Sequence, residues 1–408
     1  MTTNQGLLTG LFAATQLTRA GRLLEATALI QRTLWHRSAL AEGTDRHAPD
    51  HERGASNDVI DVEFFEVAEP AGSNPTPGLR AEGDRASGRF GIKSFPRSWR
   101  GREAVVEEPS PRTSLVDGQP GQFVTGSYAN QAGARSYKLY IPTSYMEQRL
   151  PLVVMLHGCT QTPDDFANGT RMNALAEERQ CFVLYPEQAH AANRSRCWNW
   201  FKRGNQHRDQ GEPAILAGMT REVMCRYRID PDRVYVAGLS AGGAMAAVMG
   251  TAYPELYAAV GVHSGLACGS AHDLPSALAA MRGMPRSMSG GHASPNPPAT
   301  ATPTIVFHGD RDQTVHPRNG EHVVSRSMGA SGADASIERA RVPGGHAYTR
   351  TTYRDSTGRV VMEYWLVHGG GHAWFGGSPR GSHMDPKGPD AAREMIRFFY
   401  QNALEQRA

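Results

Sequence analysis

One serine in the chain stands where a hydroxyl can serve as a nucleophile. Ser240 is the centre of Gly238-Leu239-Ser240-Ala241-Gly242, which follows an apolar run at 234–237 and precedes an alanine-rich stretch that extends to about Tyr253. The run predicts a buried strand and the stretch predicts a helix. A nucleophile on a sharp strand-to-helix turn needs glycines two positions away on either side, because larger side chains would collide with the turn. The context therefore predicts a nucleophile elbow and disfavours a chance loop rich in glycine and serine.

A serine hydroxyl is a weak nucleophile at neutral pH, so Ser240 requires a histidine as general base and a carboxylate that orients the histidine. After an elbow of this kind the acid comes first in the chain and the histidine second. Two acids follow the apolar run at 303–307. Asp312 is preferred because it lies further along the loop, within reach of a histidine on the neighbouring loop, whereas Asp310 is placed to cap the turn.

The expected base lies after the apolar run at 361–367, where two histidines are candidates. His372 follows three glycines, which free the backbone to present the imidazole at the edge of a sheet. His368 belongs to the end of the strand, so we expect it to pack or to form hydrogen bonds there. His372 is therefore the predicted base. His157, beneath the loop that follows residues 151–156, is expected to support that loop.

Attack of a serine on a carbonyl creates an oxyanion, which needs two preorganised amide donors. The first is expected from Ala241, directly after the nucleophile, and the second from the loop after residues 151–156. Cys159 is the preferred residue in that loop and Thr160 is the alternative. This chemistry needs neither a cofactor nor a metal. The sequence contains no C-x-x-C pair and no H-E-x-x-H motif, either of which would predict a zinc site.

Large aromatic side chains are concentrated in Cys197-Trp198-Asn199-Trp200-Phe201, and Trp374 stands two positions after His372. Leaving so many rings in water is unfavourable, which allows two interpretations. The rings plug a hydrophobic cap, or they form an aromatic wall for an apolar or ring-shaped substrate. In the second interpretation the substrate-binding residues are Trp198, Asn199, Trp200 and Trp374.

Strands and helices alternate through the second half of the chain and would place these residues together. Apolar runs at 151–156, 181–185, 234–237, 258–262, 304–307 and 361–367 predict strands, with helical stretches in most of the gaps, and 135–141 predicts an edge strand. The alternation predicts a mostly parallel sheet with helices on both faces. Ligands bind at the carboxyl ends of such strands, where the candidate residues all fall. With the elbow, the pattern predicts an α/β-hydrolase fold.

The 408 residues divide into three predicted parts. Residues 1–38 predict an amphipathic helical extension that carries several arginines, 39–121 a largely disordered linker rich in glycine and proline, and 122–408 the catalytic domain. The extension has two interpretations. It is a helical hairpin that packs on itself or on the main domain, or it is a basic amphipathic element that lies on a hydrophobic surface such as a lipid or polyester granule.

Composition excludes some partners and leaves others open. A net charge of +3 gives no indication of a nucleic-acid partner, and no apolar window approaches the length of a membrane span. No basic segment precedes the first apolar residues, so no signal peptide is recognised and we expect a cytoplasmic protein. Five cysteines leave at least one free thiol. A disulfide between Cys159 and Cys197 would rigidify the oxyanion loop, whereas a reducing cytoplasm disfavours it. Oligomeric state is not indicated.

Taken together, the motifs resemble one family of esterases. The matching segments are LHGCTQ at 156–161, CWNWF at 197–201, GLSAGG at 238–243, HGDRDQTV at 308–315, GGGHAW at 369–374 and DPKGPDAAREMIRFF at 385–399. As a set they resemble the poly(3-hydroxybutyrate) depolymerase family over roughly residues 122–402. The resemblance implies that Ser240, Asp312 and His372 form the catalytic triad and that Cys159 and Ala241 supply the oxyanion hole.

The resemblance also implies a substrate and a location. It predicts a serine esterase that acts through an acyl-enzyme on poly(3-hydroxybutyrate), its oligomers or related short-chain esters. The arginine-bearing extension resembles the intracellular, granule-associated branch, and an extracellular location, as in many members, is the alternative. A feruloyl or acetylxylan carbohydrate esterase is the rival enzyme, because the catalytic domain resembles those as well. A catalytically idle granule-surface binding protein is the rival of another class, which an intact Ser, Asp and His set disfavours.

Overall fold

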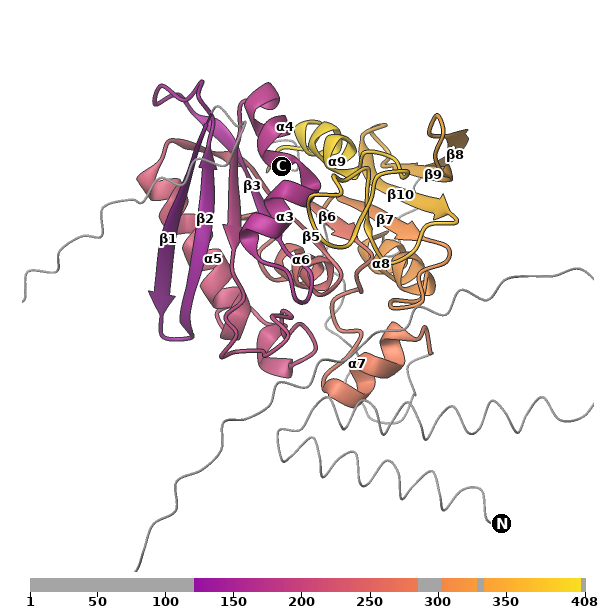
Figure 1. The fold of residues 1–408 in the computed structure, drawn as a ribbon, viewed down its shortest axis with the longest axis horizontal. Coiled ribbons are helices and arrows are strands. Elements are labelled where there is room, and N and C mark those ends of the chain that lie inside the picture. Colours follow the sequence, from indigo (N-terminus) through magenta and orange to yellow (C-terminus); the bar gives the residue numbers. More distant parts are fainter. Residues whose placement is uncertain (1–120, 285–301, 329–333, 405–408) are drawn as a thin grey trace, which may run out of the picture. The chain divides into compact units, whose positions relative to one another are not determined.

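A computed structural model describes residues 121–284, 302–328 and 334–404 (Figure 1). The helical extension predicted for 1–38 lies outside the described residues. So does the linker predicted for 39–121, apart from its last residue.

A ten-stranded sheet forms the centre of the described part of the chain, in the order β1-β2-β4-β3-β5-β6-β7-β10-β9-β8 (Figure 1). The central strands run parallel to one another; they are β4 (Phe182–Pro186), β3 (Leu150–Leu156), β5 (Ile229–Leu239), β6 (Ala259–His263), β7 (Thr304–Gly309) and β10 (Val360–His368). Antiparallel pairs flank them, namely β1 (Gln122–Asn130) with β2 (Gly133–Ile141) and β9 (Ala347–Arg354) with β8 (Asp334–Arg341). The predicted, mostly parallel sheet is confirmed.

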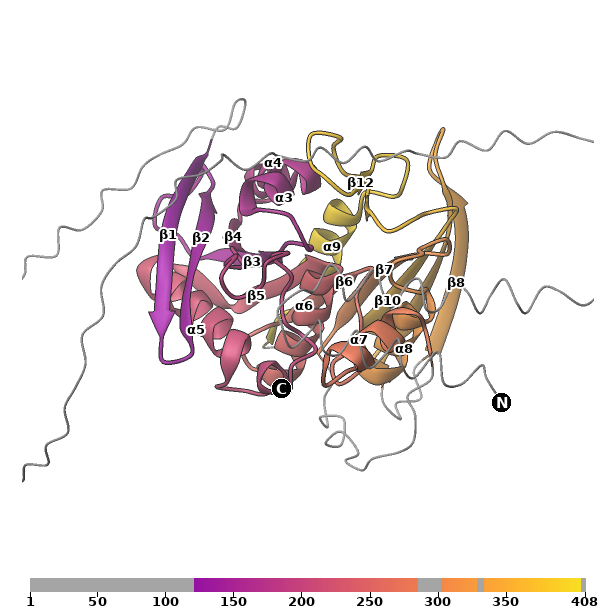
Figure 2. The same cartoon turned by 60° about the horizontal axis from the view of Figure 1, so that its bottom comes forward.

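Helices cover both faces of the sheet (Figure 2). One face carries α5 (Gly211–Arg226), α6 (Ala241–Ala252), α7 (Leu274–Met281) and α8 (Arg318–Met328), and the other carries α3 (Pro163–Thr170), α4 (Met172–Arg179) and α9 (Ala391–Tyr400). Successive residues of a strand point to opposite faces. Val154 of β3 accordingly packs in the core that includes Met245 of α6, whereas its neighbour Val153 packs with Phe166 of α3. Both faces of the central strands are therefore buried, as their continuous apolar sequence predicts.

The edges of the sheet differ from the sequence-based expectation. The strand predicted at 135–141 lies inside the sheet, because β2 pairs with β4 on one side and with β1 on the other. The β8–β9 pair was not predicted. Nearly every residue of β8 is exposed, so this strand lacks the apolar alternation by which strands are recognised in a sequence.

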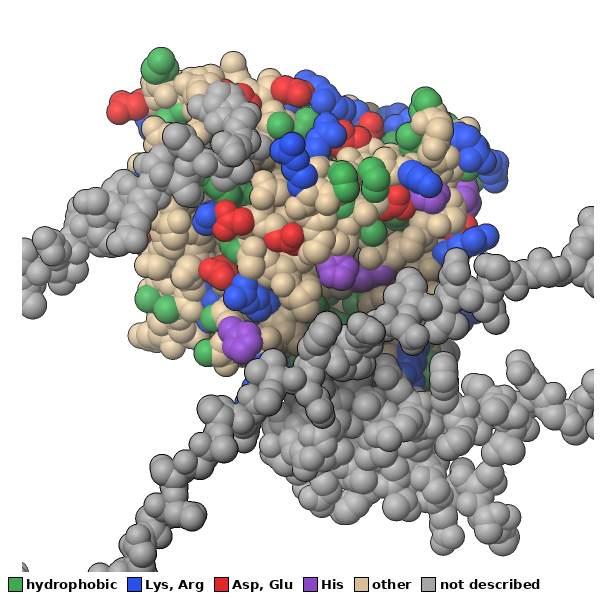
Figure 3. Space-filling view, in the orientation of Figure 1, with side chains coloured by type: hydrophobic (Ala, Val, Ile, Leu, Met, Phe, Trp, Pro, Cys, Tyr) green, Lys and Arg blue, Asp and Glu red, His purple; other side chains and the backbone are tan. Residues whose placement is uncertain are grey.

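The surface of the described residues is mixed in character. On the face seen in Figure 3, acidic and basic side chains are interspersed and hydrophobic side chains are scattered. No helix in the described residues is long and apolar enough to cross a membrane.

Parallel strands bring their carboxyl ends to one edge of the sheet, which gathers the predicted functional loops. Strand β5 ends directly before Ser240, and β3 ends directly before His157. Neighbouring strands β7 and β10 end at Gly309 and His368, next to the loops that carry the candidate acid and base. A short parallel pair, β11 (Trp374–Phe375) with β12 (Met384–Asp385), closes the loop after β10.

Candidate active site

Ser240 stands on a strained turn between β5 and α6. Its backbone has φ 57° and ψ −117°, angles that residues with a side chain rarely adopt. A Cβ atom on Gly242 would lie 2.0 Å from the carbonyl oxygen of Leu156, and one on Gly238 would lie 2.4 Å from the carbonyl carbon of Gly242. No side chain fits at either position. The local geometry is that of a nucleophile elbow.

The predicted serine, histidine and aspartate meet at this turn. His372 Nε2 lies 2.9 Å from Ser240 Oγ, and His372 Nδ1 lies 2.7 Å from Asp312 Oδ2. With the carboxylate accepting from Nδ1–H, the other ring nitrogen is left as an acceptor for the serine hydroxyl. The arrangement gives the serine a general base and gives that base a fixed tautomer.

Asp312 is buried and surrounded by donors. Its Oδ1 accepts hydrogen bonds from the amides of Thr314 and Val315, at 2.9 and 2.8 Å. His308 Nε2 donates to the carbonyl of Val315 at 2.8 Å and lies 3.4 Å from Asp312 Oδ2. Burial alone would raise the pKa of Asp312, but hydrogen bonds from the two histidines and the amides outweigh it and hold the pKa well below its ordinary value. The carboxylate stays ionised beside His372.

In the oxyanion loop, which follows β3 and carries Cys159, the amides on either side of Cys159 have acceptors. The amide of Gly158 donates to Gln161 Oε1 at 2.9 Å, that of Thr160 to the carbonyl of Ser195 at 2.7 Å, and that of Gln161 to the carbonyl of Gly158 at 3.3 Å. Among the described residues no acceptor is found for the amide of Cys159. The hydrogen bond of Thr160 removes the alternative that the sequence left open, and Cys159 remains the candidate donor.

Ala241 supplies the second candidate amide, because it is the first residue of α6 and follows the nucleophile directly. The first amides of a helix have no partner within it and lie at the positive end of its dipole. The amides of Cys159 and Ala241 are therefore the two candidate donors to an oxyanion formed beside Ser240.

Two buried histidines support the site without taking part in the triad. His157 Nε2 accepts from the amide of Gln188 at 3.1 Å, and its Nδ1 donates to the carbonyl of Gly158 at 2.7 Å. Burial lowers the pKa of His157 to about 4, so the ring is neutral at neutral pH. His263 accepts from the amide of Phe375 at 3.0 Å, and its own carbonyl accepts from the amide of Ser240 at 2.8 Å. The bonds of His157 hold the loop after β3, and those of His263 hold the backbone at Ser240 and at Phe375.

A disulfide joins Cys159 to Cys197, with their Cα atoms 4.2 Å apart. The sequence left this bond open, and the structure forms it. All five cysteines lie in the described residues, and the other three, Cys181, Cys225 and Cys268, are free. The disulfide attaches the oxyanion loop to the aromatic segment 38 residues further along the chain.

Comparison with known proteins decides the family. A family model described as "Esterase PHB depolymerase" matches residues 135–344, which is more than half of the chain. The chain belongs to this family. Its catalytic region is 32% identical over 242 residues to poly(3-hydroxyalkanoate) depolymerase C of Paucimonas lemoignei. The match covers 57% of this chain and 57% of that protein, so the chain spans little more than half the length of this relative.

Esterases with other names are also similar to this chain. Feruloyl esterase B of Neurospora crassa is 28% identical over 248 residues, which cover 58% of this chain and 83% of that protein. Among solved structures, an acetyl xylan esterase from Aspergillus awamori superposes with a TM-score of 0.51 over 65% of this chain and 94% of its own, at 20% identity. This structural likeness confirms the α/β-hydrolase fold.

The four residues of the aromatic-wall interpretation are buried in the structure, which favours the hydrophobic-plug interpretation. Trp198 and Trp374 are 0% exposed, Trp200 is 6% exposed and Asn199 is 3% exposed, so none of the four presents a surface to a ligand. Trp374 stacks on His263 with ring centroids 4.9 Å apart, and Trp198 packs 5.7 Å from His157. These rings fill the core behind the catalytic loops, which is the hydrophobic plug of the first interpretation.

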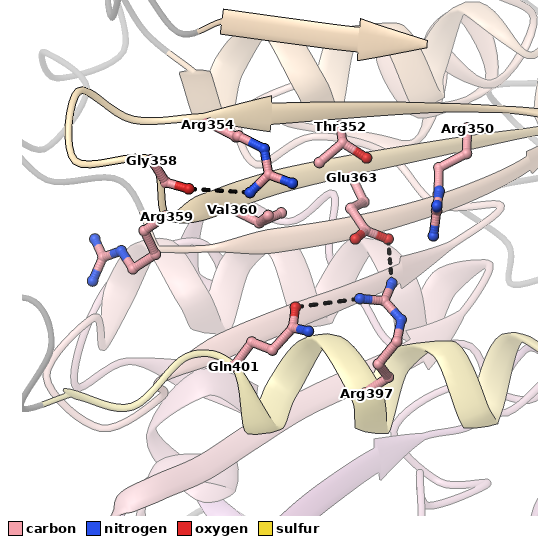
Figure 4. Close-up of a pocket in the computed structure, with 9 residues that line it drawn as sticks. All are labelled: Arg350, Thr352, Arg354, Gly358, Arg359, Val360, Glu363, Arg397 and Gln401. Atoms are coloured by element: carbon pink, nitrogen blue, oxygen red, sulfur yellow. Dashed lines mark hydrogen bonds and ion pairs between the residues drawn. The ribbon is translucent and has the colours of Figure 1, made fainter. Parts of the chain in front are cut away.

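The described residues hold a cavity of about 400 Å³ away from the triad (Figure 4). Strand β10 runs from Val360, which lines the cavity, to His368 beside the catalytic loops, so the cavity lies at the opposite end of that strand. The four arginines around it are Arg350, Arg354, Arg359 and Arg397. Three have carboxylate partners, namely Glu338 for Arg350, Asp355 for Arg359, and Glu363 and Glu394 for Arg397. Ion pairs therefore account for three of the four arginines, and Arg354 donates to the carbonyl of Gly358 at 3.1 Å.

No group of three or more His, Cys, Asp or Glu side chains within the described ranges could hold a metal ion.

Proposed function

We propose that the protein is a serine ester hydrolase that forms an acyl-enzyme on Ser240. The hydrogen-bonded series Asp312–His372–Ser240, at 2.7 and 2.9 Å, is the observation that carries the proposal. In the first step, His372 Nε2 removes the hydroxyl proton as Ser240 Oγ attacks the ester carbonyl. The amides of Cys159 and Ala241 hold the oxyanion, and the ionised carboxylate of Asp312 stabilises the imidazolium.

Collapse of the tetrahedral intermediate breaks the bond to the leaving alcohol, whose oxygen takes the proton from His372 Nε2. The acyl group then remains on Ser240. A water molecule that gives a proton to His372 attacks the acyl-enzyme, and a second tetrahedral intermediate forms in the same oxyanion hole. Return of the proton to Ser240 Oγ releases the carboxylic acid and restores the enzyme. No electrons leave the system and no cofactor enters the balance.

The substrate is proposed to be poly(3-hydroxybutyrate), its oligomers or related short-chain hydroxyalkanoate esters. The match to the depolymerase family and the identity to a poly(3-hydroxyalkanoate) depolymerase support this choice. A carbohydrate esterase is the second candidate. The matches to relatives named feruloyl esterase and acetylxylan esterase cover more than four fifths of those proteins. Hydrolysis rates on 3-hydroxybutyrate oligomers, compared with feruloylated and acetylated xylan, separate the two.

The reaction class is tested by substitution of the nucleophile. Ser240→Ala should lower kcat on p-nitrophenyl butyrate by about 10⁶-fold, and a fluorophosphonate should label the wild type and not the variant. Full activity in Ser240→Ala would overturn the mechanism. A wild type that neither hydrolyses esters nor reacts with the fluorophosphonate would favour the granule-surface binding protein.

We further propose that the protein acts in an oxidising compartment. The Cys159–Cys197 disulfide supports the extracellular alternative over a cytoplasmic location, because thiols stay reduced in the cytoplasm. Binding to a polyester granule through residues 1–38 is a separate proposal that concerns residues outside the described ranges. Sedimentation of the full chain and of residues 122–408 with amorphous poly(3-hydroxybutyrate) granules tests it, with loss of binding in the shorter chain as the expected result.

A further inference from the structure

We propose that Glu212 is a positioning residue for the oxyanion hole, and this inference rests on the proposed function. Glu212 lies in the first turn of α5 and touches none of the triad residues. It binds the segment of residues 188–201, which carries Cys197. The disulfide of Cys197 in turn fixes Cys159, whose amide is the candidate oxyanion donor.

Four donors converge on the carboxylate of Glu212. The amide and the side-chain Nδ2 of Asn199 donate to Oε2 and Oε1, each at 2.7 Å. Gln188 Nε2 donates to Oε1 at 2.5 Å, and Arg135 Nη2 lies 3.4 Å from the same oxygen. Every group that faces the carboxylate is a donor. A carboxylate, which can accept at both oxygens, matches this set of donors.

Because the carboxylate of Glu212 is buried, the loss of any of its hydrogen bonds is costly. The side chain of Glu212 is 5% exposed and that of its charge partner Arg135 is 10% exposed. A buried carboxylate is stable when it is paired and fully hydrogen-bonded, and removal of its charge leaves the surrounding donors unsatisfied. The segment at 188–201 is therefore held by hydrogen bonds to a buried carboxylate. Little bulk water reaches this carboxylate to compete for those bonds.

Two connections lead from this segment to the oxyanion loop. The side chain of Gln188, already bound to Glu212, also donates to the carbonyl of Cys197 at 3.0 Å, and Cys197 is bonded through sulfur to Cys159. In addition, the carbonyl of Ser195 accepts from the amide of Thr160 at 2.7 Å. One segment therefore holds both Cys159, the candidate oxyanion donor, and its neighbour Thr160. Glu212 in turn holds that segment.

Displacement of the Cys159 amide should act on the transition state more than on the bound ester. Oxyanion donors are aimed at charge that develops during attack, and complete loss of one typically lowers the rate by a hundredfold or more. Glu212→Gln replaces one acceptor oxygen with an NH₂ group that faces other donors. We expect kcat to fall by about 10–100-fold, with KM changed by less than about threefold.

Glu363→Gln is the matched control. Glu363 is also buried and paired with an arginine, Arg397, at 2.6 Å, but it lies beside the cavity of Figure 4 with no connection to the oxyanion loop. Wild type and both variants would be compared on p-nitrophenyl butyrate, with thermal unfolding as a measure of stability. Similar losses of stability in the two variants, with a loss of kcat in Glu212→Gln alone, are the expected result.

A transition-state analogue gives a readout that a merely structural role would not change. A butyryl trifluoromethyl ketone forms a tetrahedral adduct on the serine and places an oxyanion in the hole. Its inhibition constant should rise in Glu212→Gln by about the same factor as kcat falls, and should stay unchanged in Glu363→Gln. An unchanged inhibition constant in Glu212→Gln would overturn the proposal.

The disulfide path is tested with a double-mutant cycle. Cys197→Ala removes the tether, so if Glu212 acts through it, the combined variant should lose little more activity than Cys197→Ala alone. Independent, multiplicative losses would overturn the path through Cys197. Should Glu212→Gln fail to fold, Asn199→Ala takes its place, because it removes one bond to Glu212 and leaves the charge in position; a severalfold loss of kcat is then expected, and full activity would count against the proposal.

The outcomes for Glu212 and for the proposed function are separate. A wild type without esterase activity and without fluorophosphonate labelling would overturn both. An active wild type with an equally active Glu212→Gln variant would overturn the positioning role alone.

Discussion

Two aspartate–histidine pairs connect the loop after β7 with the end of β10 and the loop that follows it, and by distance they are nearly alike. Asp312 Oδ2 lies 2.7 Å from His372 Nδ1, and Asp310 Oδ2 lies 3.0 Å from His368 Nδ1. Their surroundings differ. The side chains of the first pair are 0% and 16% exposed, whereas those of the second are 36% and 40% exposed.

The second ring nitrogen separates the pairs further. In His372 it faces the hydroxyl of Ser240 on its strained turn, whereas in His368 it accepts from Thr349 Oγ1 at 2.9 Å on a regular strand. Water also screens the exposed pair, so its carboxylate stabilises an imidazolium less. We therefore propose that burial, together with the group beyond the histidine, suits only the Asp312–His372 pair to catalysis. The pairing distance does not distinguish the two.

The largest expected effect is the difference between two matched substitutions. Asp312→Asn should lower kcat by about 10⁴-fold, because an amide no longer fixes the tautomer of His372 or stabilises its charge. Asp310→Asn removes the same charge from the neighbouring pair and should change kcat by less than about threefold. Hydrolysis of p-nitrophenyl butyrate measures both. Equal losses in the two variants would show that the comparison is wrong.

An intermediate effect concerns stability in acid. The folded state lowers the pKa of Asp312, against the opposing effect of burial, so its ionised form stabilises the fold above the ordinary aspartate pKa of about 3.9, and this contribution is lost as the pH falls below that value. We expect the wild type to be more stable than Asp312→Asn by a few kcal/mol at pH 7. The difference should shrink progressively as the pH falls from about 5 toward 1. Urea unfolding at a series of pH values measures it, and a difference that grows in acid would contradict the assignment.

The smallest effect is expected from the exposed pair. His368→Ala should change the free energy of unfolding by about 0–1 kcal/mol, because exposed ion pairs contribute little, and it should leave kcat unchanged. Thr349→Val removes the other partner of the same ring and serves as a second probe. Urea unfolding and ester hydrolysis would be measured together. A loss of more than tenfold in kcat for either variant would mean that the two pairs act as one unit.

The fold and the triad candidates could be predicted because they depend on local patterns. The runs at 151–156, 304–307 and 361–367 become β3, β7 and β10 with ends shifted by at most two residues. Their parallel pairing brings the loops at their carboxyl ends together, so the order of Ser240, Asp312 and His372 in the chain suffices to propose the site. The roles of these residues still require the measurements above.

Features that depend on packing could not be predicted in the same way. The sequence does not show whether a tryptophan is buried or exposed. Trp198 and Trp374 are identified as core residues only by the neighbours that distant segments supply. Glu212 carried no signal, because its donors come from two distant parts of the chain, β2 and the segment of residues 188–201. Gln161 stood within a recognised motif, yet its bond to the amide of Gly158 appears only in the folded loop.

The Cys159–Cys197 bond has a consequence for how the protein matures. A nascent chain cannot close this bond until residue 197 has been synthesised. A chain kept reduced would hold its triad in place, yet its oxyanion amide would lack the sulfur tether. If the amide of Cys159 serves the oxyanion as proposed, we expect the oxidised chain to hydrolyse esters faster than the reduced chain.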